Sequence, residues 1–164
     1  ITMADNTQKH VKNLSKGDKI LTPNGSASII CLLKTICQDG VSNLVTFDNG
    51  LIITPWHPIM TKDGDWEFPA NLKTPIKTKC EAVYSLVLDV HHMAYINGVT
   101  TITLGHSYSD DVIKHPYFGS AKVIQDLMQM PGWNSGLVTV YSGCMSSTDG
   151  VIDKLVYNGH GIMV

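Results

Sequence analysis

Three short segments combine a histidine with residues that would hold its side chain in place. In residues 54–58, TPWHP, an apolar run leads into a turn that carries Thr54 and His57, and two prolines restrict the backbone around the histidine. The second segment contains the pair His91-His92, and the third, residues 103–106, ends in His106. Adjacent residues of a strand face opposite sides, so only one histidine of the pair can share a site. Because histidine exchanges protons near neutral pH, these segments predict proton-transfer chemistry.

Each of these histidines also has a purely structural explanation. His57 can be a surface residue beside a packed tryptophan, the histidine pair can be solvated at a strand end, and His106 can be a capping or surface residue. A metal site built from His57, His92 and His106 is a further alternative, since imidazole is a common metal ligand. The sequence has only two glutamates, which disfavours a paired-carboxylate hydrolase. It also has no Gly-rich phosphate loop, GxSxG or HExxH motif.

Length and composition are those of an ordinary globular domain. The chain has 164 residues, of which 43% are hydrophobic and 16% are charged, and this is enough for one domain with its own core. Its net charge is -2 and all 12 cationic residues are lysine, which argues against a nucleic-acid-binding protein. The sequence predicts neither a membrane span nor a signal peptide. We expect a monomer, with the cytoplasm as the favoured compartment, and, since position 1 is not methionine, part of a longer protein.

The cysteines at positions 31, 37, 80 and 144 do not have the spacing of a zinc site. Disulfides stay open as an alternative. Four cysteines in a chain of this length without a signal peptide nevertheless favour buried free thiols, which behave as small hydrophobic residues.

A series of Asn-Gly and Asp-Gly pairs divides the chain into short segments. The Asn-Gly pairs begin at positions 24, 49, 97 and 158, and the Asp-Gly pairs at positions 39, 63 and 149. These residues accept positive φ, as the type I′ turn of a β-hairpin requires. Runs rich in β-branched residues lie between them and predict strands at 27–33, 44–47, 51–54, 82–88, 93–96, 99–104 and 137–141.

One segment departs from this all-β pattern. Over residues 119–130, apolar side chains recur at helical spacing and Pro131-Gly132 follows, which predicts one helix of about 10–12 residues. Residues 69–79 contain two prolines and several lysines, and they predict a loop or a connecting strand on the surface. The strand-rich part is expected to end within residues 105–115.

Taken in order, these motifs resemble the Hint fold, which inteins share with the autoprocessing domain of hedgehog proteins. Thr54 and His57 fit the T-x-x-H block of that family, and residues 83–92 with the turn at 97–98 look like its C-terminal block. The opening residues, 1–18, are similar to the start of the family after its first turn. Residues 54–58, 80–85, 103–106, 115–119 and 130–133 are most similar to the Vint subgroup, found in proteins with a von Willebrand factor type A domain. The resemblance covers roughly residues 1–145.

The resemblance implies an all-β, pseudo-two-fold horseshoe of curved hairpins and a reaction on the chain's own backbone. In the family, a first-position cysteine attacks the preceding carbonyl, and the thioester made by this N–S acyl shift passes to another nucleophile. By resemblance, His57 protonates the departing amine, Thr54 hydrogen-bonds the same peptide, His92 assists the later acyl transfer, and His106 is a helper specific to the subgroup. No cofactor is implied. The implied partner is the flanking precursor, with an upstream von Willebrand factor type A domain expected.

The chain departs from the family pattern in two places. Ile1 aligns several residues inside the family's start, so we expect the nucleophile upstream and no activity from the chain as given. Inteins also end their C-terminal block with His-Asn, where this chain has Ile102-Thr103, and this favours hedgehog-like N-terminal cleavage over splicing. We therefore predict an autoprocessing core in residues 1–106 and, packed on it, an extension in residues 107–164 with one short helix. A catalytically silent interaction module with the same fold is the alternative.

Overall fold

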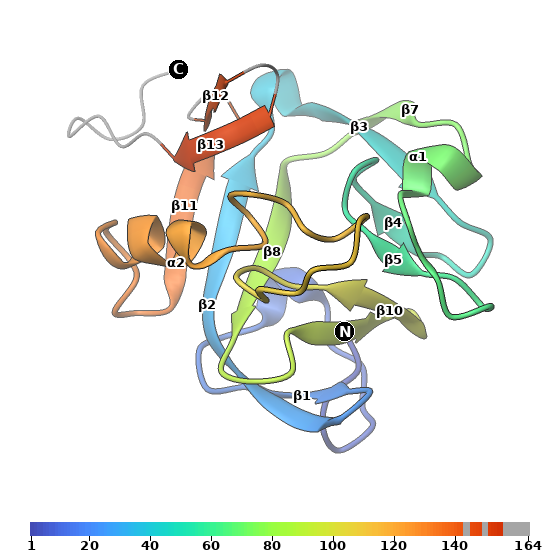
Figure 1. Cartoon of the computed structure of the whole chain (residues 1–164), viewed down its shortest axis with the longest axis horizontal. Coiled ribbons are helices and arrows are strands. Elements are labelled where there is room, and N and C mark those ends of the chain that lie inside the picture. Colours follow the sequence, from blue (N-terminus) through green and yellow to red (C-terminus); the bar gives the residue numbers. More distant parts are fainter. Residues whose placement is uncertain (143–144, 149–150, 156–164) are drawn as a thin grey trace.

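The computed structural model describes residues 1–142, 145–148 and 151–155, and these residues form a mostly β protein (Figure 1). The all-β prediction is confirmed, since most elements are strands in antiparallel sheets and one helix of the described residues is longer than a single turn. That helix, α2 (Ala121–Met128), lies in the C-terminal part, as predicted. No helix of the described part of the chain is long and apolar enough to cross a membrane.

The largest sheet is built around β2 (Gly25–Ile36), a strand of 12 residues. Its first residues pair antiparallel with β1 (Lys19–Thr22). Its later residues pair antiparallel with β8 (Ala82–Leu88) at one edge and parallel with β11 (Leu137–Tyr141) at the other. The predictions for β8 and β11 match residue for residue, whereas β2 extends beyond the predicted strand at both ends.

Two smaller sheets carry the rest of the N-terminal part. One has the order β6 (Trp66–Glu67), β5 (Ile59–Met60), β10 (Val99–Ile102) and β9 (Met93–Ile96). The other has the order β4 (Ile52–Ile53), β3 (Val41–Thr46) and β7 (Ile76–Lys79). The segment predicted as a loop or surface strand, 69–79, contains a single turn of helix, α1 (Pro69–Leu72), followed by the edge strand β7.

The type I′ hairpin prediction is right at one described turn, 97–98, which joins the paired strands β9 and β10. At 39–40 the positive φ values are as predicted, but the turn joins β2 to β3, which do not pair with each other; at the other three described pairs the prediction is wrong. Both residues of the pairs at 97–98 and 39–40 have positive φ, whereas only the glycine does at 24–25, 49–50 and 63–64. At the last two pairs the N–H of the glycine donates to the carbonyl three residues earlier, the geometry of a longer loop that ends in a left-handed glycine. In the first case the register places Thr22 opposite Gly25, so the turn is centred one residue earlier. The pairs at 149–150 and 158–159 lie outside the described residues.

The helix α2 begins after Ser120, whose Oγ accepts a hydrogen bond from the N–H of Lys122 at 3.3 Å. It ends at Met128, shorter than predicted, and turns Val123 and Leu127 into the core. Two segments of the described residues form one turn of 3₁₀ helix each, η1 (Val11–Asn13) and η2 (Gln38–Gly40). The last described strands are β12 (Met145–Thr148) and β13 (Val151–Leu155), which pair antiparallel.

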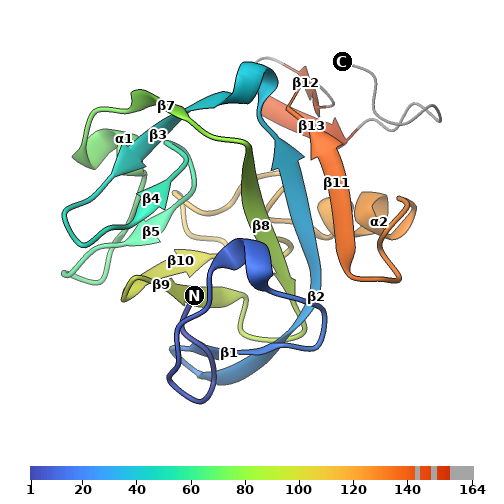
Figure 2. The same ribbon diagram turned by 180° about the vertical axis from the view of Figure 1, so that it is seen from behind.

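The C-terminal part shares a hydrophobic core with the long strands β2 and β8. Cys31 and Leu33 of β2 and Val87 of β8 pack with Tyr117, with residues of α2 and with Val138 and Val140 of β11. From both sides of the molecule, β11 and α2 flank one edge of the β2–β8 pair, while β3, β4, β5, β7 and α1 lie beyond the other (Figures 1 and 2).

The three described cysteines are free thiols. Cys31 and Cys37 are buried, as predicted, while Cys80 is partly exposed. The sulfur atoms of Cys37 and Cys80 are 3.7 Å apart. Cys144 lies outside the described residues.

Candidate functional site

The turn that follows β4 presents His57 with its ring held at one nitrogen. The N–H of His57 donates to the carbonyl of Thr54 at 3.3 Å, and Pro55 occupies the position of the turn that suits proline. Nε2 of His57 lies 2.8 Å from the carbonyl oxygen of Ile102, at the end of β10. Because a carbonyl oxygen only accepts, Nε2 carries the proton. In the neutral ring, Nδ1 is therefore the unprotonated nitrogen, and no described residue hydrogen-bonds it.

The surroundings of His57 favour its neutral form. Burial lowers the pKa of this imidazole, and the bond to the Ile102 carbonyl offsets part of that effect. Neighbouring Trp56 is 68% exposed and its ring meets Phe68 edge-on, with centroids 5.6 Å apart. Trp56 therefore lies at the surface, whereas His57 is partly buried. Thr54 is partly buried, and its hydroxyl hydrogen-bonds no described residue.

One peptide unit connects His57 to the second histidine segment. The carbonyl of Ile102 accepts from His57, while the N–H of the next residue, Thr103, donates to the carbonyl of His92 at 2.9 Å. The described chain has no cis peptide bond, and in a trans peptide the C=O and N–H point in opposite directions. The imidazole of His57 and the backbone of His92 thus lie on opposite sides of the chain that leaves β10.

The structure brings His92 and His106 together around Tyr108. The rings of His106 and Tyr108 are stacked with centroids 5.2 Å apart, and the ring of His92 meets Tyr108 edge-on at 6.5 Å. His106 is buried, and its Nδ1 accepts the N–H of Tyr108 at 2.9 Å. Sequence reasoning missed Tyr108, although its position two residues after a candidate histidine was visible.

Burial lowers the pKa of both histidines of this cluster. For His92, His91 adds to the effect and Asp89 opposes it. For His106, the Ile113 carbonyl opposes the effect and His92 adds to it. Both rings are therefore held toward the neutral form, in which one nitrogen donates and the other accepts.

The pair His91-His92 lies in the connection between β8 and β9, with His91 in a bend and His92 directly before the first residue of β9. Both residues have positive φ, 65° and 46°, a region that costs non-glycine residues about 1–3 kcal/mol each. The ring of His91 lies near the β1–β2 turn, where a Cβ added at Gly25 would be 3.9 Å from its Nε2. Only the ring of His92 is thus in contact with the Tyr108 cluster.

Two buried polar atoms at this place have no hydrogen-bond partner among the described residues. They are Nδ1 of His92 and Oγ1 of Thr103. Leaving a buried donor or acceptor unpaired costs about 1–3 kcal/mol, and such atoms are unusual enough in folded proteins to require an explanation. The hydrogen-bonding capacity of both atoms is therefore unused within the described part of the chain.

The metal-site alternative receives no ligand set from the structure. Among the described residues, no three His, Cys, Asp or Glu side chains lie close enough to hold a metal ion. Asp111, four residues before His115 in the sequence, forms an ion pair with Lys114.

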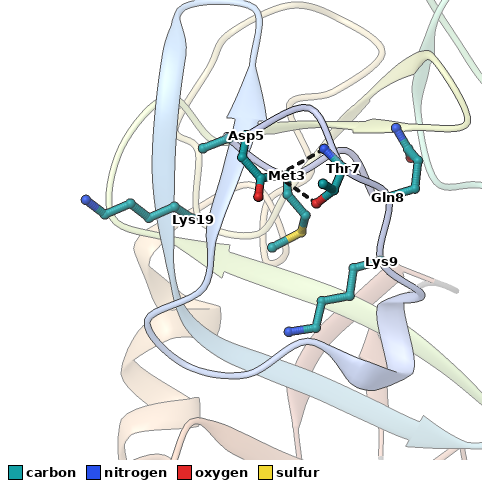
Figure 3. Close-up of a pocket in the computed structure, with 7 residues that line it drawn as sticks. Met3, Asp5, Thr7, Gln8, Lys9 and Lys19 are labelled. Carbon is teal, nitrogen blue, oxygen red and sulfur yellow. Dashed lines mark hydrogen bonds between the residues drawn. The ribbon is translucent and has the colours of Figure 1, made fainter.

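A surface hollow of about 480 Å³ lies elsewhere, at the N-terminal loop (Figure 3). Its lining includes Met3, Lys9 and Lys19, as well as Asp5, whose carboxylate accepts from both the N–H and the hydroxyl of Thr7. None of the four predicted site residues contributes to that lining. The hollow and the histidines are therefore separate features of the molecule.

Comparison with known proteins identifies the family. The Vint family model, described as a Hint-domain, matches residues 1–153. This is most of the chain, which therefore belongs to the Vint family of Hint domains, as the resemblance of its motifs predicted. No curated protein was found to match the chain.

Two solved structures with a similar arrangement are inteins. The gp41-1 intein is 15% identical, with a TM-score of 0.46 over 63% of this chain and 92% of the intein. A variant of that intein with three substitutions is also 15% identical, with a TM-score of 0.40 over 58% of this chain and 87% of the variant.

Proposed function

We propose that this Hint domain processes its own precursor by a cysteine-dependent N–S acyl shift. The observation that carries the proposal is the 2.8 Å bond between Nε2 of His57 and the carbonyl of Ile102, in a chain that belongs to the Hint family. The bond fixes the ring and its tautomer, and it leaves Nδ1 as the atom that exchanges a proton. Fixed geometry is what a proton-transfer residue needs.

The first step requires a cysteine that precedes Ile1 in the precursor. Its sulfur forms a bond to the carbonyl carbon of the residue before it, while the thiol proton passes to Nδ1 of His57. The same proton then passes to the amide nitrogen as the carbon–nitrogen bond breaks, which leaves a thioester and a free amine. The lowered pKa of His57 suits this sequence, because the neutral ring accepts a proton and the charged ring readily releases it.

Thr54 and the second histidine cluster would serve the remaining events. Thr54, on the same turn as His57, is assigned a hydrogen bond to the peptide that breaks. His92 and His106 are assigned to the step in which water, a thiol or another nucleophile takes the acyl group from the thioester. The unpartnered Nδ1 of His92 supports this assignment, because in the tautomer with its proton on Nε2 this atom would accept the proton of a nucleophile that reaches it.

We also propose which side of the domain is cleaved and which domain flanks it. Ile102-Thr103 stands where inteins have His-Asn, which favours cleavage at the N-terminal side over splicing. We assign the processing core to residues 1–106 and the packed extension to 107–164, with a von Willebrand factor type A domain as the upstream flank. The second candidate function, an interaction module without chemistry, would not need the proton held on Nε2 of His57.

The test uses the precursor with its natural upstream segment. We expect it to break at the upstream cysteine, faster with added thiol, and mass spectrometry of the fragments identifies both the bond and the flank. His57→Ala should slow this cleavage by about 10²–10⁴-fold, while the exposed His10→Ala should leave it unchanged. The proposal is refuted if the precursor stays intact both with and without thiol. It is also refuted if the precursor that carries His57→Ala is cleaved at the normal rate, and either result favours the interaction module.

A further inference from the structure

We propose that Tyr108 is a positioning residue that holds His92 and His106 in register with each other. The role assigned to the two histidines rests on the proposed function, but the positioning itself is a property of the folded chain. Tyr108 lies in residues 107–164, the part that was predicted to be an extension. The extension therefore contributes to the candidate site and does not only cover the core.

The first argument is the number of contacts that Tyr108 makes with the histidines. Its N–H donates to Nδ1 of His106 at 2.9 Å, and its ring stacks on the same imidazole. Its hydroxyl donates to the carbonyl of His91 at 3.0 Å, and the edge-on contact reaches His92. One side chain thus joins two segments that are 14 to 17 positions apart in the sequence.

The second argument is that the backbone is strained both in the histidine pair that Tyr108 contacts and in the residue directly before Tyr108. His91 and His92 have positive φ, and so does Ser107, at 59°. Residues held in this region persist only when their surroundings enforce the conformation. The hydroxyl of Tyr108 supplies such a restraint by binding the carbonyl between the two strained histidines.

The third argument is that the other side of His106 is closed by backbone. The N–H of Gly105 donates to the carbonyl of Phe118, and that of Ser107 donates to the carbonyl of Gly119. A Cβ at Gly119 would lie 3.0 Å from Nε2 of His106. The imidazole is therefore enclosed between Gly119 and Tyr108, and its tautomer is set because the Tyr108 N–H makes Nδ1 the acceptor.

Tyr108 itself is 38% exposed, which is more than a residue needs if its only role is to fill the core. Substitution at this position should accordingly leave the fold intact. The groups that face the two imidazoles are His91 and Asp89 for His92, and His92 and the Ile113 carbonyl for His106. None of these is removed by a change at Tyr108.

The test is an NMR titration of the histidine rings in the 164-residue chain. In Tyr108→Leu we expect the titration midpoints of His92 and His106 to rise, because both rings lose their aromatic cover. The midpoint of His115 should stay the same. The control is Tyr141→Leu, a partly buried tyrosine of β11, which should move neither. Unchanged midpoints for His92 and His106 in folded Tyr108→Leu overturn the proposal.

A second variant decides the matter if Tyr108→Leu does not fold. Tyr108→Phe keeps the ring and loses only the hydroxyl, so the amide of His92, which donates to Val90, should exchange with solvent at least several-fold faster. An unchanged exchange rate overturns the proposal. In the precursor, Tyr108→Leu should leave thioester formation intact and slow its resolution by about 10²-fold. The ring titration needs no cleavage, so it distinguishes failed positioning from failure of the proposed processing.

Discussion

Tyr117 provides the sharpest test of how the C-terminal part is attached to the rest of the domain. Its side chain is 1% exposed and packs in the core that β2 and β8 share with α2 and β11. Its hydroxyl donates to the Asp126 carboxylate at 2.7 Å and accepts the N–H of Leu155 at 3.1 Å. One oxygen atom therefore connects the helix α2 to the strand β13.

Replacing Tyr117 with phenylalanine removes that oxygen and leaves the ring, so no cavity is added to the loss. A hydrogen bond to a charged group contributes about 1.5–3 kcal/mol, and a buried N–H left without a partner costs about 1–3 kcal/mol. Asp126 is half-buried and recovers part of its loss by contact with water. We therefore expect Tyr117→Phe to lower the free energy of unfolding by about 2–4 kcal/mol, or the Tm by about 4–16 °C.

The measurement is urea unfolding of the two proteins, with the Tm as a second readout. The matched control is Tyr141→Phe in the neighbouring strand β11, a tyrosine whose hydroxyl has no hydrogen bond to a described residue, and it should change the free energy of unfolding by less than about 0.5 kcal/mol. If Tyr117→Phe destabilises the protein no more than this control does, the oxygen does not join α2 to β13 in the way the reasoning requires.

Three further predictions concern the backbone, the histidines and the thiols. Gly132→Ala should lower the free energy of unfolding far more than Gly64→Ala. Both glycines have φ near 90°, which costs alanine about 1–2 kcal/mol, but a Cβ at Gly132 would lie 2.0 Å from the Leu137 carbonyl oxygen, whereas one at Gly64 meets open space. Equal losses of the free energy of unfolding in urea would contradict this prediction. Burial lowers the pKa of four histidines below 6.5 in the folded chain, so the unfolded chain binds more protons at acidic pH; they are His57, His92, His106 and His115. The free energy of unfolding should therefore fall as the pH drops below 6.5, by at most about 1.4 kcal/mol per pH unit for each histidine. A free energy of unfolding that stays constant or rises as the pH drops would contradict the burial of these rings. Oxidised glutathione should link Cys37 to Cys80, whose sulfurs are 3.7 Å apart, and peptide mapping should show that bridge, whereas separate glutathione adducts would contradict it.

The sequence predicted best those strands whose side chains alternate over several residues. β8, β9 and β11 match their predictions because runs of apolar, aromatic and β-branched residues are followed by polar or turn residues that mark where each strand ends. The two-residue strands β5 and β6 were missed, since two residues carry no periodicity. Proline and lysine left residues 69–79 open between a loop and a surface strand, and the second alternative is right for β7, an edge strand, where such residues are tolerated and protect against aggregation.

Part of the candidate site could be predicted from neighbouring residues in the sequence, and part depends on contacts between residues that are distant in the sequence. The T-x-x-H spacing and its prolines identified the turn of His57, because its prolines and the bond from the His57 N–H to the Thr54 carbonyl lie within five residues. The Ile102 carbonyl that holds the ring is distant in the sequence and had no local signal. Nothing local indicates that His91 and His92 have positive φ, since glycine and asparagine are the residues that usually do. Nor does any local pattern place Tyr108 against His91, because that contact depends on the way residues 107–119 fold back over the end of β10.

The peptide between Ile102 and Thr103 makes the two histidine segments depend on each other. Its carbonyl holds the ring of His57 and its N–H holds the backbone of His92, so a displacement of the end of β10 moves both. The buried, unpartnered hydroxyl of Thr103 belongs to the same unit, and a protein selected for stability alone would place an apolar side chain there. Neither apolar packing nor a hydrogen bond to a described residue therefore accounts for a hydroxyl at the position that joins the two histidine segments.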